Sequence, residues 1–115
     1  MEGRKDDSEK NRLDLIPYDV IWGLGEILTF GAKKYSDRNW EKGMRWGRCF
    51  AAMMRHLFAW WQSKSPTTMS FLFGELDMET GKSHALHALC CLVFLCGYEM
   101  RGIGVDDRPV RAKSE

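Results

Sequence analysis

Apolar residues recur at helical spacing in three segments of the chain. In the first, residues 17–35, a series that includes Ile21 and Leu24 repeats every three or four positions and predicts a helix. Gly23 and Gly25 lie inside this helix and weaken it, so we expect either a kink or a close contact with another helix there.

Second and third helices are predicted over residues 48–62 and 83–100. In the third, every residue from 85 to 96 except His87 is apolar, so almost all sides of that helix must be covered by protein. Three helices can hardly do this alone, which favours packing against a second copy of the chain. We find no strand alternation and no repeat, so the predicted fold class is all-α, a small helical bundle whose core is completed by oligomerisation.

The two ends of the chain are more polar than its middle. Residues 1–12 and 102–115 are predicted to be flexible tails, which leaves residues 13–101 as one helical domain. Serine, aspartate, asparagine and two glycines between residues 35 and 48 predict a loop, and residues 63–73 are predicted to be a connection.

Composition and charge exclude some classes of partner. A chain of 115 residues that is 44% hydrophobic suits one globular domain with its own core. Its net charge of +1 lacks the excess typical of nonspecific nucleic-acid or membrane binding, so we expect neither as a partner. The N-terminus has no signal-peptide core, and the longest apolar run, residues 88–95, is far shorter than the roughly 20 residues that span a bilayer.

The four cysteines show none of the paired spacings of zinc ribbons or disulfide frameworks. Free cysteines in apolar segments are usually buried and reduced. We therefore expect a reducing, cytoplasmic compartment. The cysteines are Cys49, Cys90, Cys91 and Cys96.

Potential metal ligands are concentrated just before and within the third predicted helix. Three carboxylates alternate in a loop bounded by glycines, where they repel one another unless a cation lies among them. His84 and His87 follow, one helical turn apart on the same face, and His56 is the remaining histidine of the chain. An acidic loop alone is usually a solvated turn, and a lone histidine is usually a hydrogen-bonded core residue, but their joint presence favours a functional site. The carboxylates are those of Glu75, Asp77 and Glu79.

Positive charge is concentrated between residues 31 and 48, although the whole chain is nearly neutral. Arginine forks and mobile lysine ammonium groups are natural partners of phosphate. Arg48 and Arg55 also share a face of the second helix with small alanine neighbours. A basic loop alone is more often solvated surface, but next to a metal-binding loop it indicates polyphosphate chemistry. The basic residues of the segment are Lys33, Lys34, Arg38, Lys42, Arg45 and Arg48.

Four blocks of the chain together resemble a known family. They are "DLIP" at 14–17, "FGAKKYSDRNWEKG" at 30–43, "RHLFAWW" at 55–61 and "GELDMETGKSHALHALCCLVFL" at 74–95. In this order they resemble the phage-type dATP/dGTP diphosphohydrolases, a group similar to the MazG-like all-α nucleotide pyrophosphohydrolases. The resemblance covers about residues 13–100.

The resemblance implies a fold, an activity and a partner. It implies a MazG-like helical catalytic domain that forms a homodimer or homotetramer, in the host cytoplasm if a phage encodes it. The reaction it implies is metal-dependent hydrolysis of dATP or dGTP to the monophosphate and pyrophosphate, by water attack on the α-phosphorus. Magnesium is the usual ion with triphosphates, while imidazole ligands also suit manganese, cobalt or zinc.

Site residues follow from the resemblance together with the charge pattern. We expect the chemical step to depend on Glu75, Asp77 and His87, with either a carboxylate or His87 as the proton acceptor. The expected substrate-binding residues are Lys33, Lys34, Tyr35, Arg38, Asn39, Trp40 and Arg55. The expected metal ligands are Glu75, Asp77, Glu79, His56, His84 and His87.

The chain departs from the broader MazG-like pattern in two ways. It lacks the Glu-x-x-Glu and Glu-x-x-Asp pairs of those enzymes within its predicted helices, so histidines take over part of the metal-binding role. The link over residues 63–73 is also longer than usual and is interpreted as an added lid or an oligomer contact. The alternative function is a module that binds nucleic acid or a host protein and uses the acidic and histidine residues as a structural metal site.

Overall fold

A computed structural model describes residues 3–6, 8–64 and 75–111. Within them the regular elements are all helical, which confirms the predicted all-α class. The interpretation of the 63–73 link as a lid or oligomer contact lies outside the described residues from residue 65 onward. In chain order the elements are the short 3-10 helix η1 (Leu13–Leu15), α1 (Tyr18–Lys34), a second 3-10 helix η2 (Asn39–Lys42), α2 (Trp46–Gln62) and α3 (His84–Arg101).

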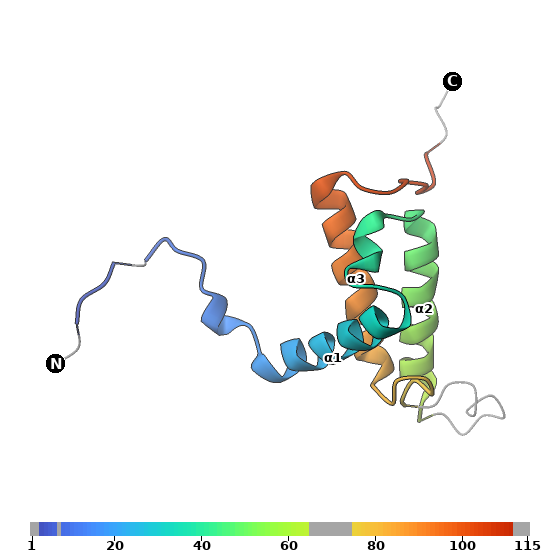
Figure 1. Cartoon of the computed structure of the whole chain (residues 1–115), viewed down its shortest axis with the longest axis horizontal. Helices are drawn as coiled ribbons and strands as arrows, with labels where there is room; N and C mark the ends of the chain where they lie inside the picture. The colour runs from blue at the N-terminus through green and yellow to red at the C-terminus, as the bar shows by residue number, and fades with distance from the viewer. Residues whose placement is uncertain (1–2, 7, 65–74, 112–115) are drawn as a thin grey trace.

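The helices α2 and α3 lie side by side and form the body of the molecule (Figure 1). Helix α1 packs on α3 with its C-terminal part, while its N-terminal part and the preceding segment extend away from the body (Figure 1). The three helices match the predicted ones to within two residues at each end. The Ser83 side chain accepts a hydrogen bond from the Ala85 N–H and caps α3, which therefore starts immediately after the acidic loop.

A buried aromatic cluster fixes the basic loop to α3. Tyr98 is fully buried, and its Oη donates a hydrogen bond to the Trp40 carbonyl oxygen at 2.7 Å. The Trp40 ring stacks on Phe94 with a centroid distance of 4.8 Å. A Cβ added at Gly97 would lie 2.8 Å from that ring, so the glycine provides the room that Trp40 occupies. The cluster holds η2, and with it the neighbouring cationic residues, against the helix that carries His84 and His87.

The start of the predicted C-terminal tail is packed against α2. Trp46 donates hydrogen bonds from its N–H to the Val105 carbonyl oxygen and from Nε1 to the Ile103 carbonyl oxygen, both at 2.9 Å. Asp107 Oδ1 accepts the Gly47 N–H at 2.7 Å and so satisfies a free donor at the N-terminus of α2. The folded part of the chain therefore continues past the predicted boundary at residue 101.

The close helix contact predicted near the two glycines of α1 is found at Gly23. A Cβ there would lie 2.8 Å from Leu86 Cδ1 of α3, whereas a Cβ at Gly25 would meet no atom within 4 Å. The absence of a side chain at Gly23 therefore lets α1 pack closely on Leu86 of α3.

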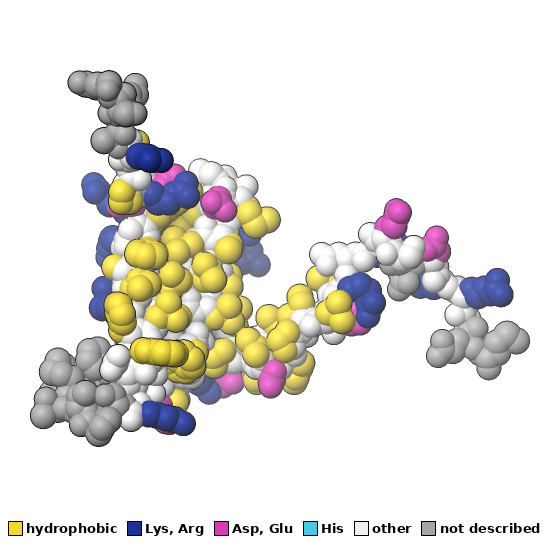
Figure 2. Space-filling model, turned by 180° about the vertical axis from the view of Figure 1, so that it is seen from behind, with side chains coloured by type: hydrophobic (Ala, Val, Ile, Leu, Met, Phe, Trp, Pro, Cys, Tyr) yellow, Lys and Arg dark blue, Asp and Glu magenta, His cyan; other side chains and the backbone are white. Residues whose placement is uncertain are grey.

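Large apolar side chains remain exposed on α2 and α3. Figure 2 shows them gathered over the face of the body that is turned away from the viewer in Figure 1. Among the described residues, no helix has the length and apolarity that a membrane crossing requires. The exposed large apolar residues of α2 and α3 are Phe50, Leu57, Phe58, Trp60, Trp61, Leu92 and Met100.

Candidate functional site

The acidic loop, residues 75–83, is a tight turn held between α1 and α3. Asp77 N–H donates to the Lys82 carbonyl oxygen and Gly81 N–H donates to the Asp77 carbonyl oxygen, each at 2.8 Å. Gly81 has a φ of +72°, a backbone conformation that glycine adopts without strain. Two ion pairs of 2.5 Å, Lys34–Glu79 and Lys82–Glu26, tie the loop to α1.

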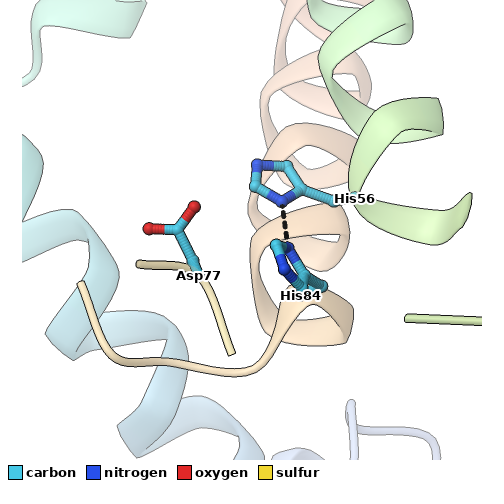
Figure 3. A group of neighbouring side chains, drawn as sticks. All are labelled: His56, Asp77 and His84. Atoms are coloured by element: carbon cyan, nitrogen blue, oxygen red, sulfur yellow. Dashed lines mark hydrogen bonds between the residues drawn. The ribbon is translucent and has the colours of Figure 1, made fainter. Parts of the chain in front are cut away.

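All three histidines of the chain meet at this loop. His56 Nδ1 on α2 lies 2.9 Å from His84 Nδ1 on α3, and the His56 ring stacks on His87 with a centroid distance of 4.6 Å. Asp77 lies beside the His56–His84 pair, and one ligand atom from each of these three residues lies within 4.8 Å of the others (Figure 3). The cluster is therefore assembled from two helices and the loop.

The protonation states of the cluster suit a cation. Burial lowers the pKa of His56 to about 4, and the neighbouring His87 and His84 act in the same direction. Burial also lowers the pKa of His87. For Asp77, burial alone would raise the pKa, but hydrogen bonds from the backbone of Thr80 and Glu79 and the nearby His87 outweigh it and lower the pKa. At neutral pH the imidazoles of His56 and His87 are therefore neutral and the Asp77 carboxylate is ionised, which are the forms that bind metals.

A cavity of about 990 Å³ connects this cluster to the basic loop. Its volume is at the upper end of the range usual for small-molecule sites. Cations from the segment between α1 and α2 face the same space as His56, Asp77 and His87. The charged residues that line it are Lys34, Asp37, Arg38, Glu41, Lys42, Arg48, Asp77 and Glu79.

Most of the predicted site residues line this cavity, and four do not. Glu75 and Arg55 are exposed, and Lys33 lines a smaller neighbouring cavity of about 560 Å³. His84 does not line the cavity, but its Nδ1 contacts Nδ1 of His56, which does. The predicted residues that line the cavity are Lys34, Tyr35, Arg38, Asn39, Trp40, His56, Asp77, Glu79 and His87.

Thr80 is a polar residue of the site that sequence reasoning missed. Thr80 Oγ1 lies 2.7 Å from His87 Nε2 and 3.3 Å from Asp77 Oδ1, so its hydroxyl joins two predicted site residues. The available signal was the Asp77-x-x-Thr80 spacing, which is typical of a turn in which the aspartate carboxylate accepts backbone N–H groups. Apolar lining from Cys90, Cys91 and Phe94 was also not predicted as part of the site.

The donor set of His56, Asp77 and His84 fits a divalent ion. In the chain alone the Nδ1 atoms of His56 and His84 are at hydrogen-bond distance, 2.9 Å, and a bound ion would take the place of that contact. Two imidazoles and one carboxylate also leave coordination positions for water and phosphate oxygens, as catalytic sites require.

These features define a class: small all-α proteins in which a cleft lined by both cations and carboxylates contains a histidine and carboxylate cluster. The chain belongs to the family described as dATP/dGTP diphosphohydrolase, N-terminal, which matches residues 1–108. A relative named dATP/dGTP diphosphohydrolase, from Salmonella phage PMBT28, is 32% identical over 95 residues, which cover 83% of this chain and 29% of the relative. The chain thus spans less than a third of the length of that relative. No solved structure matches the chain.

Proposed function

We propose that the chain hydrolyses dATP and dGTP to the monophosphate and pyrophosphate with the help of a divalent cation. The observation that carries the proposal is the shared cavity, which brings unpaired cations and a histidine and carboxylate cluster to one space. Family membership and the name of the phage relative support the reaction and the two substrates.

The metal ligands in this proposal are His56, Asp77 and His84. A bound divalent ion neutralises phosphate charge and lowers the pKa of a water molecule in its coordination shell. Magnesium is the usual partner of triphosphates, but two imidazoles among three ligands favour manganese, cobalt or zinc more than an all-oxygen site does. Glu79 is a further carboxylate at the cavity, and it forms an ion pair with Lys34.

In this proposal the phosphate groups bind to cationic side chains that have no carboxylate partner. Among the described residues, Arg38, Lys42 and Arg48 line the cavity and form no salt bridge, so their charge is available to a ligand. Lys34 joins them when a phosphate oxygen replaces Glu79 as its partner. Preorganised positive charge of this kind usually makes the largest contribution to phosphoryl-transfer catalysis.

His87 is the proton acceptor in this proposal. It is neutral at pH 7, lines the cavity, and lies next to the metal ligands without being one of them. His87 takes a proton from water, and the water oxygen forms a bond to the α-phosphorus. The bond from that phosphorus to the bridging oxygen breaks, and its electron pair leaves with pyrophosphate.

The test is a nucleotide panel with product analysis. Purified chain is incubated with dGTP, dATP, dCTP or dTTP and with magnesium or manganese, and we expect deoxynucleoside monophosphate and pyrophosphate from the purine nucleotides, with no product after chelation. Asp77→Asn should lower kcat at least about 100-fold, because an amide is a much weaker ligand than a carboxylate. The matched control is Glu99→Gln, which removes a charge at the opposite end of α3 and should leave turnover unchanged.

Other outcomes of these experiments would contradict the proposed hydrolase or its metal site. Absence of turnover combined with DNA binding that weakens steeply as salt rises would support a nucleic-acid-binding module instead. Full activity of Asp77→Asn would contradict the assignment of Asp77 as a metal ligand. Manganese titration by calorimetry measures that site without any turnover.

The proposal includes a second copy of the chain on the exposed apolar face. Phe50, Leu57, Phe58 and Trp61 have the spacing of one face of α2, and each is more than a third exposed. Contiguous apolar surface of this kind marks protein interfaces. A homodimer or homotetramer would cover the face that α2 and α3 leave open in one chain.

A further inference from the structure

The Thr80 hydroxyl lies at the centre of three polar contacts. The Lys82 N–H donates to Thr80 Oγ1 at 3.1 Å, His87 Nε2 lies 2.7 Å from it, and Asp77 Oδ1 lies 3.3 Å from it. Asp77 Oδ1 also accepts the N–H groups of Glu79 and Thr80 at 3.0 Å each, which fixes this oxygen in place.

Counting protons selects one arrangement of these contacts. A threonine hydroxyl donates once and accepts twice, and Lys82 already uses one acceptor position. If the hydroxyl donates to His87, its lone pairs and those of the ionised Asp77 face each other with no proton between them. If it donates to Asp77, it accepts from a proton on His87 Nε2, and all three contacts are hydrogen bonds. The second arrangement is the favourable one because it leaves no acceptors opposed.

We propose that Thr80 is a positioning residue that places the proton of neutral His87 on Nε2 and leaves the Nδ1 lone pair available to accept a proton from water. The chain of donors then runs from His87 Nε2–H to Thr80 Oγ1 and from Thr80 Oγ1–H to Asp77 Oδ1. Among the described residues, His87 Nδ1 has no hydrogen-bond partner.

The arrangement also helps His87 after it has taken the proton. When Nδ1 gains a proton, the positive charge of the ring is connected through Thr80 to the negative charge of Asp77. The same logic applies wherever a carboxylate fixes the tautomer of a histidine base. Here the carboxylate acts through a hydroxyl, since Asp77 Oδ1 is 3.8 Å from His87 Nε2, too far for a direct hydrogen bond.

The effect of Thr80 on catalysis rests on the proposed function, whereas its effect on the His87 tautomer does not. The experiment therefore measures the tautomer and the kinetics separately. Nitrogen-15 NMR of histidine-labelled protein distinguishes a protonated from an unprotonated ring nitrogen, and the His87 signals are assigned by their loss in His87→Gln. We expect the proton on Nε2 in the unsubstituted chain. In Thr80→Val, which keeps the shape and removes the hydroxyl, we expect a shift toward the Nδ1–H form, while Thr80→Ser should retain the Nε2–H form.

Kinetics of the same variants give the second measurement. Thr80→Val should lower kcat about 10- to 100-fold with less than about a threefold change in KM, and Thr80→Ser should restore most of kcat. Ser63→Ala is the control for both measurements, because among the described residues the Ser63 hydroxyl bonds only the Trp60 carbonyl oxygen.

Two spectroscopic results would overturn the inference: a proton on Nδ1 in the unsubstituted chain, or an unchanged His87 spectrum in Thr80→Val. If the tautomer is as expected but the chain hydrolyses no nucleotide, the proposed function fails and the role of Thr80 in fixing the tautomer stands.

Discussion

The turn of the acidic loop gives two nearby carboxylates different surroundings. Asp77 and Glu75 are two positions apart in one acidic loop, and the sequence offers no reason to separate them. In the structure, Asp77 faces the histidines while Glu75 is exposed and does not line the cavity. The turn decides this, because backbone hydrogen bonds to Asp77 Oδ1 hold that side chain inward. Patterns of residue types identify such a loop, but its local geometry selects the residues.

Burial of Cys90 leads to a prediction about its reactivity. Burial raises the pKa of the Cys90 thiol to about 12, so at pH 8 only about one molecule in ten thousand carries the reactive thiolate. We expect iodoacetamide to modify Cys90 at least about 100-fold more slowly in the folded chain than in urea. The folded rate should rise with pH up to about pH 12, since the thiolate is the minor form below that value. Peptide mass spectrometry measures the modification, and equal rates in the folded and unfolded chains would contradict the assigned burial.

At the scale of elements, the sequence predicts where the helices are better than how they meet. Apolar periodicity predicts all three helices, because a helix that buries one face has apolar residues at every third or fourth position. The close contact between α1 and α3 was predicted only as an alternative to a kink, and the sequence does not distinguish Gly23 from Gly25 as its position. The packing of residues 103–108 on α2 was not predicted, because it depends on single hydrogen bonds such as Asp107 to Gly47.

The two glycines of α1 give a matched test of the helix contact. Gly25→Ala should stabilise the fold by up to about 1 kcal/mol, because alanine has the higher helix propensity and the new Cβ meets no atom within 4 Å. Gly23→Ala gains the same propensity but forces the Leu86 side chain to move, which offsets part or all of that gain. Urea unfolding followed by circular dichroism should therefore rank Gly25→Ala as the more stable variant. Equal stabilities would show that α1 and α3 are not in close contact at Gly23.

At the scale of the whole molecule, one chain is too extended to be a complete globule. Its radius of gyration is 18.4 Å, whereas a compact chain of this length has about 13 Å. Figure 1 shows the reason, since the N-terminal part of α1 and the segment before it project from the body. The same segment contains exposed apolar residues, among them Leu15, Tyr18 and Trp22. Apolar surface is therefore left open on both the arm and the body.

The final prediction tests whether a second copy covers the face of α2. Phe58 is 55% exposed on this face, so Phe58→Glu costs little in an isolated chain but places a charge in the proposed interface. Light scattering after gel filtration should give the mass of a dimer or tetramer for the unsubstituted chain and a smaller mass for Phe58→Glu. Val110→Glu is the control, because this residue is 92% exposed in the C-terminal segment and should leave the mass unchanged. A 13.3 kDa monomer for the unsubstituted chain would contradict the proposed oligomer, because the exposed apolar face would then remain uncovered.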